Sequence, residues 1–177
     1  MLVVSLGFTS EQKPFSLQQV DTSTLESLIT KELNKVRIEA KLIPLKENQA
    51  LKKAAEDQAK YISSIGKLSH RQPNKQKEKA RNRVVFYGGK MQGIGENTAN
   101  IKVFETALYK GKNGQIDTVN ISSMDQAVDY IVYAWMNSEH HKTNILYEKF
   151  RETGLKVVYN KQLKTLYAVQ VFGYPYE

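Results

Sequence analysis

The sequence predicts an α+β protein, built as a three-layer α-β-α sandwich around a central, mainly antiparallel sheet. Amphipathic helical segments occupy the first part of the chain, and a further helix precedes two strand-like runs near the C-terminus. Strands do not alternate with helices along the chain, which argues against a doubly wound sheet. The C-terminal strands are apolar on both faces, so the sheet needs helices on both sides.

Two helices are predicted before residue 67. Ser23 and Glu26 have the spacing of a capping box, so we expect the first helix to begin there. Pro44 forces the chain out of helix, Asn48 is suited to cap the second helix, and Gly66 supplies its stop. The apolar stripes recur at helical spacing. They comprise Leu25, Leu28, Ile29, Leu33 and Val36, then Leu51, Ala54, Ala55, Gln58, Ala59, Ile62 and Ile65.

The secondary structure in the middle of the chain is harder to predict from the sequence. Residues 71–83 are polar, and a short apolar run then enters the glycine-rich segment 88–95. We interpret this region as a loop that delivers the chain to a site. A strand is expected from Gly95 to about Glu105, and the glycines and asparagine of residues 111–114 indicate a turn.

The last third of the chain has clear signals again. Ser123 and Gln126 repeat the capping-box spacing before an amphipathic helix that we expect to end near Asn137. A histidine-rich turn and a short helical segment at 144–150 should follow. Alternating residues then predict strands around 155–159 and 166–172, which the turn at 160–164 joins into an antiparallel hairpin. The apolar stripe of the helix comprises Ala127, Val128, Ile131, Val132 and Trp135.

The amino-acid composition excludes several kinds of functional site and partner. The 26 Lys and Arg exceed the 18 Asp and Glu, a formal charge of +8 that favours anionic surfaces at low salt. The densest basic cluster, at residues 75–83, has no interleaved aromatics, so we expect no nucleic-acid partner. The absence of cysteine excludes disulfides, thiolate metal sites and cysteine nucleophiles.

We expect residues 21–177 to form one domain, and residues 1–20 to be a tether or the remnant of an export signal. The start, residues 1–8, is apolar but too short to span a membrane and lacks a basic flank. A trimmed signal, a cloning remnant, an N-terminal strand and a tether all remain open from sequence. No other stretch is suited to cross a bilayer.

The histidines suggest where chemistry lies. His70 follows the second helix, and His140 and His141 follow the third, while Glu96 and Asn97 end the glycine-rich segment. Two imidazoles and one carboxylate suit zinc or another divalent ion with an open fourth position, which polarises water in hydrolases. The alternative is a hydrogen-bonded cluster that ties loops together. Neither a phosphate-binding glycine loop nor a nucleophile elbow is present.

Five blocks together resemble the bacterial branch of the CAP superfamily, named for cysteine-rich secretory proteins, antigen 5 and pathogenesis-related proteins. The match follows the family's order and spacing across residues 25 to 173. Its blocks are Asn34 to Leu45, Leu51 to His70, Gly95-Glu96-Asn97, Trp135 to Leu146, and Tyr167 to Gly173. The resemblance implies an α-β-α sandwich with a central cleft, lined in many members by two histidines and two acidic residues.

Carried over by position, the resemblance makes His70, Glu96 and His141 cleft residues and candidate ligands of a divalent metal. Ser138 falls on the second acidic position, and Tyr167 on the later histidine position. Both are poorer metal ligands, so the tetrad is incomplete. His140 stands where glycine is usual, and with Asn97 and Tyr167 it is expected beside the cleft.

The resemblance also implies an extracytoplasmic location, secreted or on the cell surface. The lysine-rich, cysteine-free composition is similar, more narrowly, to outer-surface CAP lipoproteins of Borrelia, which are lipid-anchored. We expect a monomeric binding module whose partner is a small apolar ligand such as a lipid or sterol, or a host or envelope macromolecule. The alternative is a metal-dependent hydrolase that uses His70, His141 and Glu96.

Overall fold

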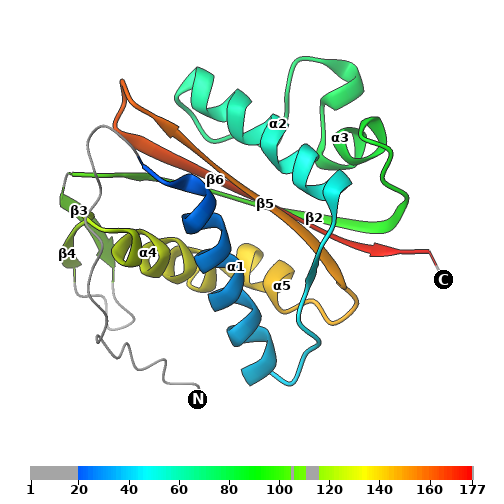
Figure 1. The fold of residues 1–177 in the computed structure, drawn as a ribbon, viewed down its shortest axis with the longest axis horizontal. Coiled ribbons are helices and arrows are strands. Elements are labelled where there is room, and N and C mark those ends of the chain that lie inside the picture. The colour runs from blue at the N-terminus through cyan, green and yellow to red at the C-terminus, as the bar shows by residue number, and fades with distance from the viewer. Residues whose placement is uncertain (1–19, 105, 111–115, 177) are drawn as a thin grey trace.

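The computed structural model describes residues 20–104, 106–110 and 116–176 and confirms the three-layer arrangement (Figure 1). A four-stranded sheet lies in the middle. Helices α2 (Gln49–Ile65) and α3 (Ala80–Phe86) cover one face, and α1 (Thr22–Glu39), α4 (Met124–Met136) and α5 (Glu139–Ile145) cover the other. The predicted turn at 111–114 and most of the predicted N-terminal tether lie outside the described residues.

The sheet has the strand order β1-β5-β6-β2. Strands β2 (Met91–Lys102), β5 (Glu152–Asn160) and β6 (Thr165–Pro175) are antiparallel, and only the short β1 (Lys46–Glu47) runs parallel to its neighbour. Strand β2 therefore forms one edge. A separate antiparallel pair is formed by β3 (Thr106–Lys110) and β4 (Ile116–Asn120).

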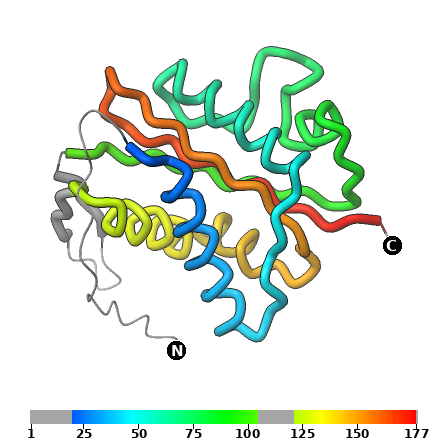
Figure 2. The backbone as a smooth tube through the Cα atoms, viewed as in Figure 1, coloured from blue at the N-terminus to red at the C-terminus, as the bar shows by residue number. Residues whose placement is uncertain are grey.

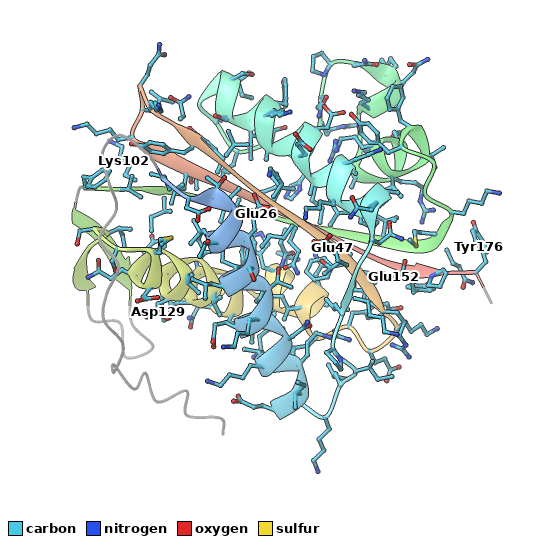
Figure 3. The ribbon with its side chains drawn as sticks, viewed as in Figure 1. Glu26, Glu47, Lys102, Asp129, Glu152 and Tyr176 are labelled. Carbon is cyan, nitrogen blue, oxygen red and sulfur yellow. The ribbon has the colours of Figure 1, made fainter. Side chains whose placement is uncertain are left out.

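Both faces of the sheet bury apolar side chains, as the alternation in β6 predicts. Phe172, Ala168 and Leu166 pack with α1 and α4, whereas Val171 and Val169 pack under α2. Figure 2 shows how α1, near the start of the chain, lies beside β5, near its end. Glu26 of α1, labelled in Figure 3, accepts the backbone N–H of Val157 at 3.1 Å and pairs with the ammonium of Lys156.

The caps of α2 and α4 are as predicted, but that of α1 is not. Asn48 caps α2 by accepting two backbone N–H groups, and Gly66 ends it at a φ of 65°. Ser123 and Gln126 form the predicted capping box of α4. In α1 the cap is Asp21, which accepts the N–H of Thr24, so the predicted start at Ser23 is wrong. Glu26 is instead engaged with β5, a contact that local spacing does not reveal.

Two other predictions need correction. The polar region 71–83 and the run after it do not form one loop, because they contain a short 3₁₀ helix, η1 (Lys75–Lys77), and α3, and β2 already begins at Met91. The histidine-rich segment after α4 is the helix α5 rather than a turn. The short helix predicted at 144–150 is wrong, because only Asn144 and Ile145 are helical, as the end of α5. The C-terminal hairpin is confirmed.

A fully buried arginine joins α1 to the segment that follows α5. The Arg37 guanidinium donates to the backbone carbonyls of Ile43, Ile145 and Phe150 at 2.9, 2.6 and 3.1 Å, and to that of Tyr147 at 3.2 Å. These carbonyls belong to the segment after α1 and to the end of α5 with the residues that follow it, so one side chain joins the two segments. Burial, with the nearby charge of Arg151, lowers the pKa of Arg37.

Candidate functional site

The candidate site lies at the middle of β2, the edge strand. Successive side chains of a strand point to opposite faces of its sheet. Glu96, in register with Val171, faces the α2 layer, and Asn97, in register with Gln170, faces α5. Two neighbouring residues that the sequence singles out therefore reach opposite sides of the same edge.

Glu96 is held by the segment at residues 67–90, which we call the hood because it covers this part of β2. One oxygen of Glu96 accepts from His70 Nδ1 at 2.9 Å, and the other accepts from Arg83 Nη2 at 2.5 Å. The Glu96 side chain is 5% exposed and that of Arg83 is 0% exposed. The guanidinium also donates to the carbonyls of Lys77 and Glu78. Glu96 is thus one half of a buried ion pair.

His70 and His141 differ in their affinity for protons. The hydrogen bond to Glu96 raises the pKa of His70, although partial burial and the Arg83 charge oppose that rise. Burial lowers the pKa of His141, and the charges of His70 and His140 lower it further. His70 and His141 therefore lie close enough to influence each other across the edge of β2. The bond to Glu96 therefore favours the imidazolium form of His70, whereas the surroundings of His141 favour its neutral ring.

Asparagine side chains fix α5 against β2. Asn97 Nδ2 donates to the backbone carbonyl of His141 at 3.0 Å. Asn144 Nδ2 in turn donates to Asn97 Oδ1 at 2.8 Å and to the carbonyl of Glu96 at 3.3 Å. These bonds position the helix that carries His141. The sequence interpretation missed Asn144, whose only signal was its place in the block that follows His141.

The remaining predicted residues are placed differently. Ser138 is the N-cap of α5, but its side chain makes no capping hydrogen bond, and His140 is exposed. Tyr167 is 1% exposed and packs in the core with α2 and α3, in register with Asn100 rather than beside Glu96. The structure therefore gathers His70, Glu96, Asn97 and His141 near one another, whereas Tyr167 belongs to the core.

A cleft of about 490 Å³ opens beside Glu96 and His70. Arg71, Lys79 and Ala80 of the hood complete its lining. Arg71 and Lys79 are exposed cations, and the only carboxylate of the lining is already neutralised by Arg83. The lining therefore carries net positive charge. Sequence reasoning missed Arg71, Lys79 and Arg83, because it treated the hood as an unstructured connection.

These residues do not fit a divalent metal in this arrangement. Both oxygens of Glu96 are hydrogen-bonded, and the Arg83 guanidinium beside them repels a cation. Within the part of the chain that the structure describes, no three histidine, aspartate or glutamate side chains form a group that could hold a metal ion. The zinc site thus stays a prediction from sequence, which the geometry does not favour.

Fold and cleft together define an α-β-α sandwich protein with a polar, histidine-containing cleft at the edge of its sheet. Residues 30–172 match the family model described as CAP, the Cysteine-rich secretory protein family. The chain therefore belongs to the CAP family, although it contains no cysteine. No curated protein sequence is significantly similar to it.

Three solved bacterial structures share the fold. An outer surface protein of Borrelia burgdorferi has a TM-score of 0.68 at 16% identity, with 89% of this chain and 97% of that chain covered. An extracellular SCP-domain protein of Bacillus anthracis gives 0.63 at 22% identity, covering 94% and 45%. A cysteine-rich secretory protein of Staphylococcus aureus gives 0.59 at 16%, covering 86% and 39%. The chain spans less than half the length of the last two proteins.

Proposed function

We propose that this protein acts outside the cytoplasm as a non-enzymatic binding module, whose cleft takes an anionic segment of a host or envelope macromolecule. The observation that carries the proposal is the pairing of Glu96 with Arg83 and His70, which leaves Lys79 and the Glu78-paired Arg71 on a lining whose carboxylate is already engaged. The extracytoplasmic location is supported by the outer-surface and extracellular relatives of the same fold.

The cleft chemistry favours a charged partner over a small apolar ligand. Arg71 and Lys79 stand on the cleft lining, and His70 gains charge readily because Glu96 raises its pKa. Arg71 also pairs with Glu78 at 2.8 Å, a contact that an incoming carboxylate or sulfate could exchange. Charged linings of this kind increase association rates and discriminate between partners through charge complementarity. A sterol or a neutral lipid would offer these cations no anionic group.

The hydrogen bonds of Glu96 also argue against the hydrolase alternative. A general base must be free to accept a proton from water, and a metal ligand must offer a lone pair to the ion. Glu96 accepts hydrogen bonds at both oxygens, one of them from the Arg83 guanidinium. Its carboxylate is therefore committed to holding the hood on β2.

The proposal is tested by measuring binding to immobilised anionic polymers, namely heparin, poly-L-glutamate and peptidoglycan fragments, at low and high salt. Arg71→Glu with Lys79→Glu should lower the affinity for the bound polymer by about tenfold or more, because two favourable charges become repulsive. The matched control, Lys31→Glu with Lys53→Glu, has the same net charge but alters only α1 and α2. Equal losses in both double variants would show that the cleft is not the binding site.

A further inference from the structure

A second surface lies where the end of α2 meets the turn between β5 and β6. It combines exposed aliphatic side chains with lysines, and we call it the basic tip. Its six residues are Ile65, Lys67, Leu68, Lys161, Leu163 and Lys164. None of them lines the cleft of the proposed function.

Three aliphatic side chains of the basic tip are exposed to solvent. Ile65 is 46% exposed, Leu68 37% and Leu163 44%. Single exposed apolar residues are common on protein surfaces, but a group at one place marks an interaction surface. Leu163 and the α2 terminus are close together, since a Cβ built on Gly66 would lie 3.2 Å from Leu163 Cδ1.

The basic tip is held in a fixed shape. Asn160 Nδ2 donates to the carbonyl of Ser63 at 2.9 Å, which ties the β5–β6 turn to the last turn of α2. Asn160 Oδ1 also accepts the N–H of Leu163 at 3.0 Å, so the same side chain shapes the turn. Gly66 adopts the left-handed conformation that ends α2 and directs Lys67 outward. A preformed surface loses little conformational entropy on binding.

The charge around the basic tip has one sign. The two chain segments that build it, residues 58–77 and 153–176, contain no Asp or Glu at all, although the whole chain has 18. Lys67, Lys161 and Lys164 are exposed and form no ion pair with the described residues. The partner must therefore be anionic.

We propose that the basic tip docks the protein on a bilayer surface that contains anionic phospholipid. Ile65, Leu68 and Leu163 enter the interface between headgroups and acyl chains, while the three lysines of the tip contact lipid phosphates. The aliphatic chemistry decides against the other anionic partners. Nucleic acids are bound by basic residues that contact phosphates and, where single-stranded, by aromatic stacking, so neither mode uses the exposed aliphatic side chains of the tip. The six tip residues include no aromatic residue.

The position of the basic tip agrees with this orientation. The start of α1, the turn between β5 and β6 and the end of α2 all lie at one end of the molecule (Figure 1). A flat surface at this end would therefore contact both the end of α2 and the turn between β5 and β6. Docking is independent of the proposed function, because the residues that carry it are separate from the cleft residues.

The test is co-sedimentation of the protein with vesicles of phosphatidylcholine alone and with vesicles that contain phosphatidylglycerol. We expect binding to the anionic vesicles only. Each lysine near an anionic surface contributes roughly fivefold in the partition coefficient, so Lys161→Glu with Lys164→Glu should reduce it by at least about twentyfold. Ile65→Ser with Leu163→Ser should reduce it by about tenfold, because the aliphatic groups no longer enter the interface.

Matched variants separate docking from general electrostatic attraction. Lys31→Glu with Lys53→Glu changes the same number of charges elsewhere, and Val85→Ser with Phe86→Ser removes two exposed apolar residues of α3. Both should bind vesicles like the wild type, as should the cleft variant Arg71→Glu with Lys79→Glu. If any of these loses as much binding as the tip variants, or if the serine variant of the tip loses none, the proposal is overturned.

A fluorescent variant tests insertion directly. The native Trp135 is fully buried, so the emission of Leu163→Trp reports the basic tip against a constant background. Its emission should shift to the blue on anionic vesicles, and acyl-chain bromination of the lipid should quench it. Val85→Trp on α3 should show neither effect. A tip tryptophan that stays in water while the protein sediments with vesicles, or heparin binding without vesicle binding, would contradict docking in the bilayer interface.

Discussion

The layer formed by α1, α4 and α5 differs from the hood in what holds it to the sheet. The first buries large apolar side chains, with Trp135 and Leu25 fully enclosed. The hood buries Val84 but otherwise rests on a polar network, in which Lys77 pairs with Asp57 at 2.7 Å and Arg83 pairs with Glu96. Apolar burial depends on area, whereas a buried ion pair depends on geometry. We therefore expect a single substitution in this network to detach the hood from the sheet while the rest of the fold stays intact.

The largest expected effect is in the apolar layer. Trp135→Ala removes a fully buried ring and should lower the free energy of unfolding by about 3–5 kcal/mol. Trp135→Phe is the matched variant, because it retains most of the packing and loses the indole N–H bond to the carbonyl of Thr98. Thermal unfolding of both proteins measures the difference. A melting temperature of Trp135→Ala close to that of the wild type would contradict the packing described here.

The ion pair of the hood should give the next largest effect. Arg83→Met leaves the buried carboxylate of Glu96 without its guanidinium, which typically costs about 3 kcal/mol or more. Adding Glu96→Gln removes the buried charge and should recover part of the loss. Chemical denaturation measures the stability, and hydrogen exchange in α3 shows where the structure opens. Uniform exchange across α3 and α4 would contradict local release of the hood.

His70 and His141 should have opposite effects on how stability depends on pH. The folded protein holds the His70 proton more tightly than the unfolded chain does, since Glu96 raises its pKa. Its contribution is complete below the unfolded pKa of about 6.5 and is lost as the pH rises through the folded pKa. His141 has a lowered pKa, so its contribution is present above about 6.5 and is lost as the pH falls through its folded pKa.

Nuclear magnetic resonance titration of the imidazole protons measures both values. His70 should titrate above, and His141 below, an unfolded reference. The variant Glu96→Gln should bring the pKa of His70 down, because the charged partner is gone. It should also decrease the stability that the protein gains from protonated His70. An unchanged His70 titration in this variant would show that the bond to Glu96 is absent in solution.

The smallest expected effect is on zinc affinity. Because Glu96 is engaged by Arg83, calorimetric titration with zinc should give the same result for wild type, His70→Ala and His141→Ala. If both alanine variants lose binding that the wild type shows, and if acidification below about pH 6 weakens it, the two histidines do form a metal site. That outcome would return the hydrolase alternative to consideration.

Local sequence signals determined much of the scaffold. Asn48 and Gly66 bound α2, and Ser123 with Gln126 begins α4, because a cap depends on residues within one turn of the helix end. Alternation in β5 and β6 predicted a sheet that is covered on both faces. The blocks that resemble the CAP superfamily also identified the family.

Only the tertiary structure decided how the charged residues are used. Glu26 has the spacing of a capping residue, but its carboxylate bonds to β5, and the cap of α1 is Asp21. In the sequence, Arg83 is one of several cations in a polar segment. In the structure, β2 places Glu96 beside it, and the two form a buried ion pair. Caps and alternation depend on neighbours along the chain, whereas an ion pair depends on which distant groups the fold brings together. The sequence by itself determined the layers, and the long-range pairing of charges decided the character of the cleft.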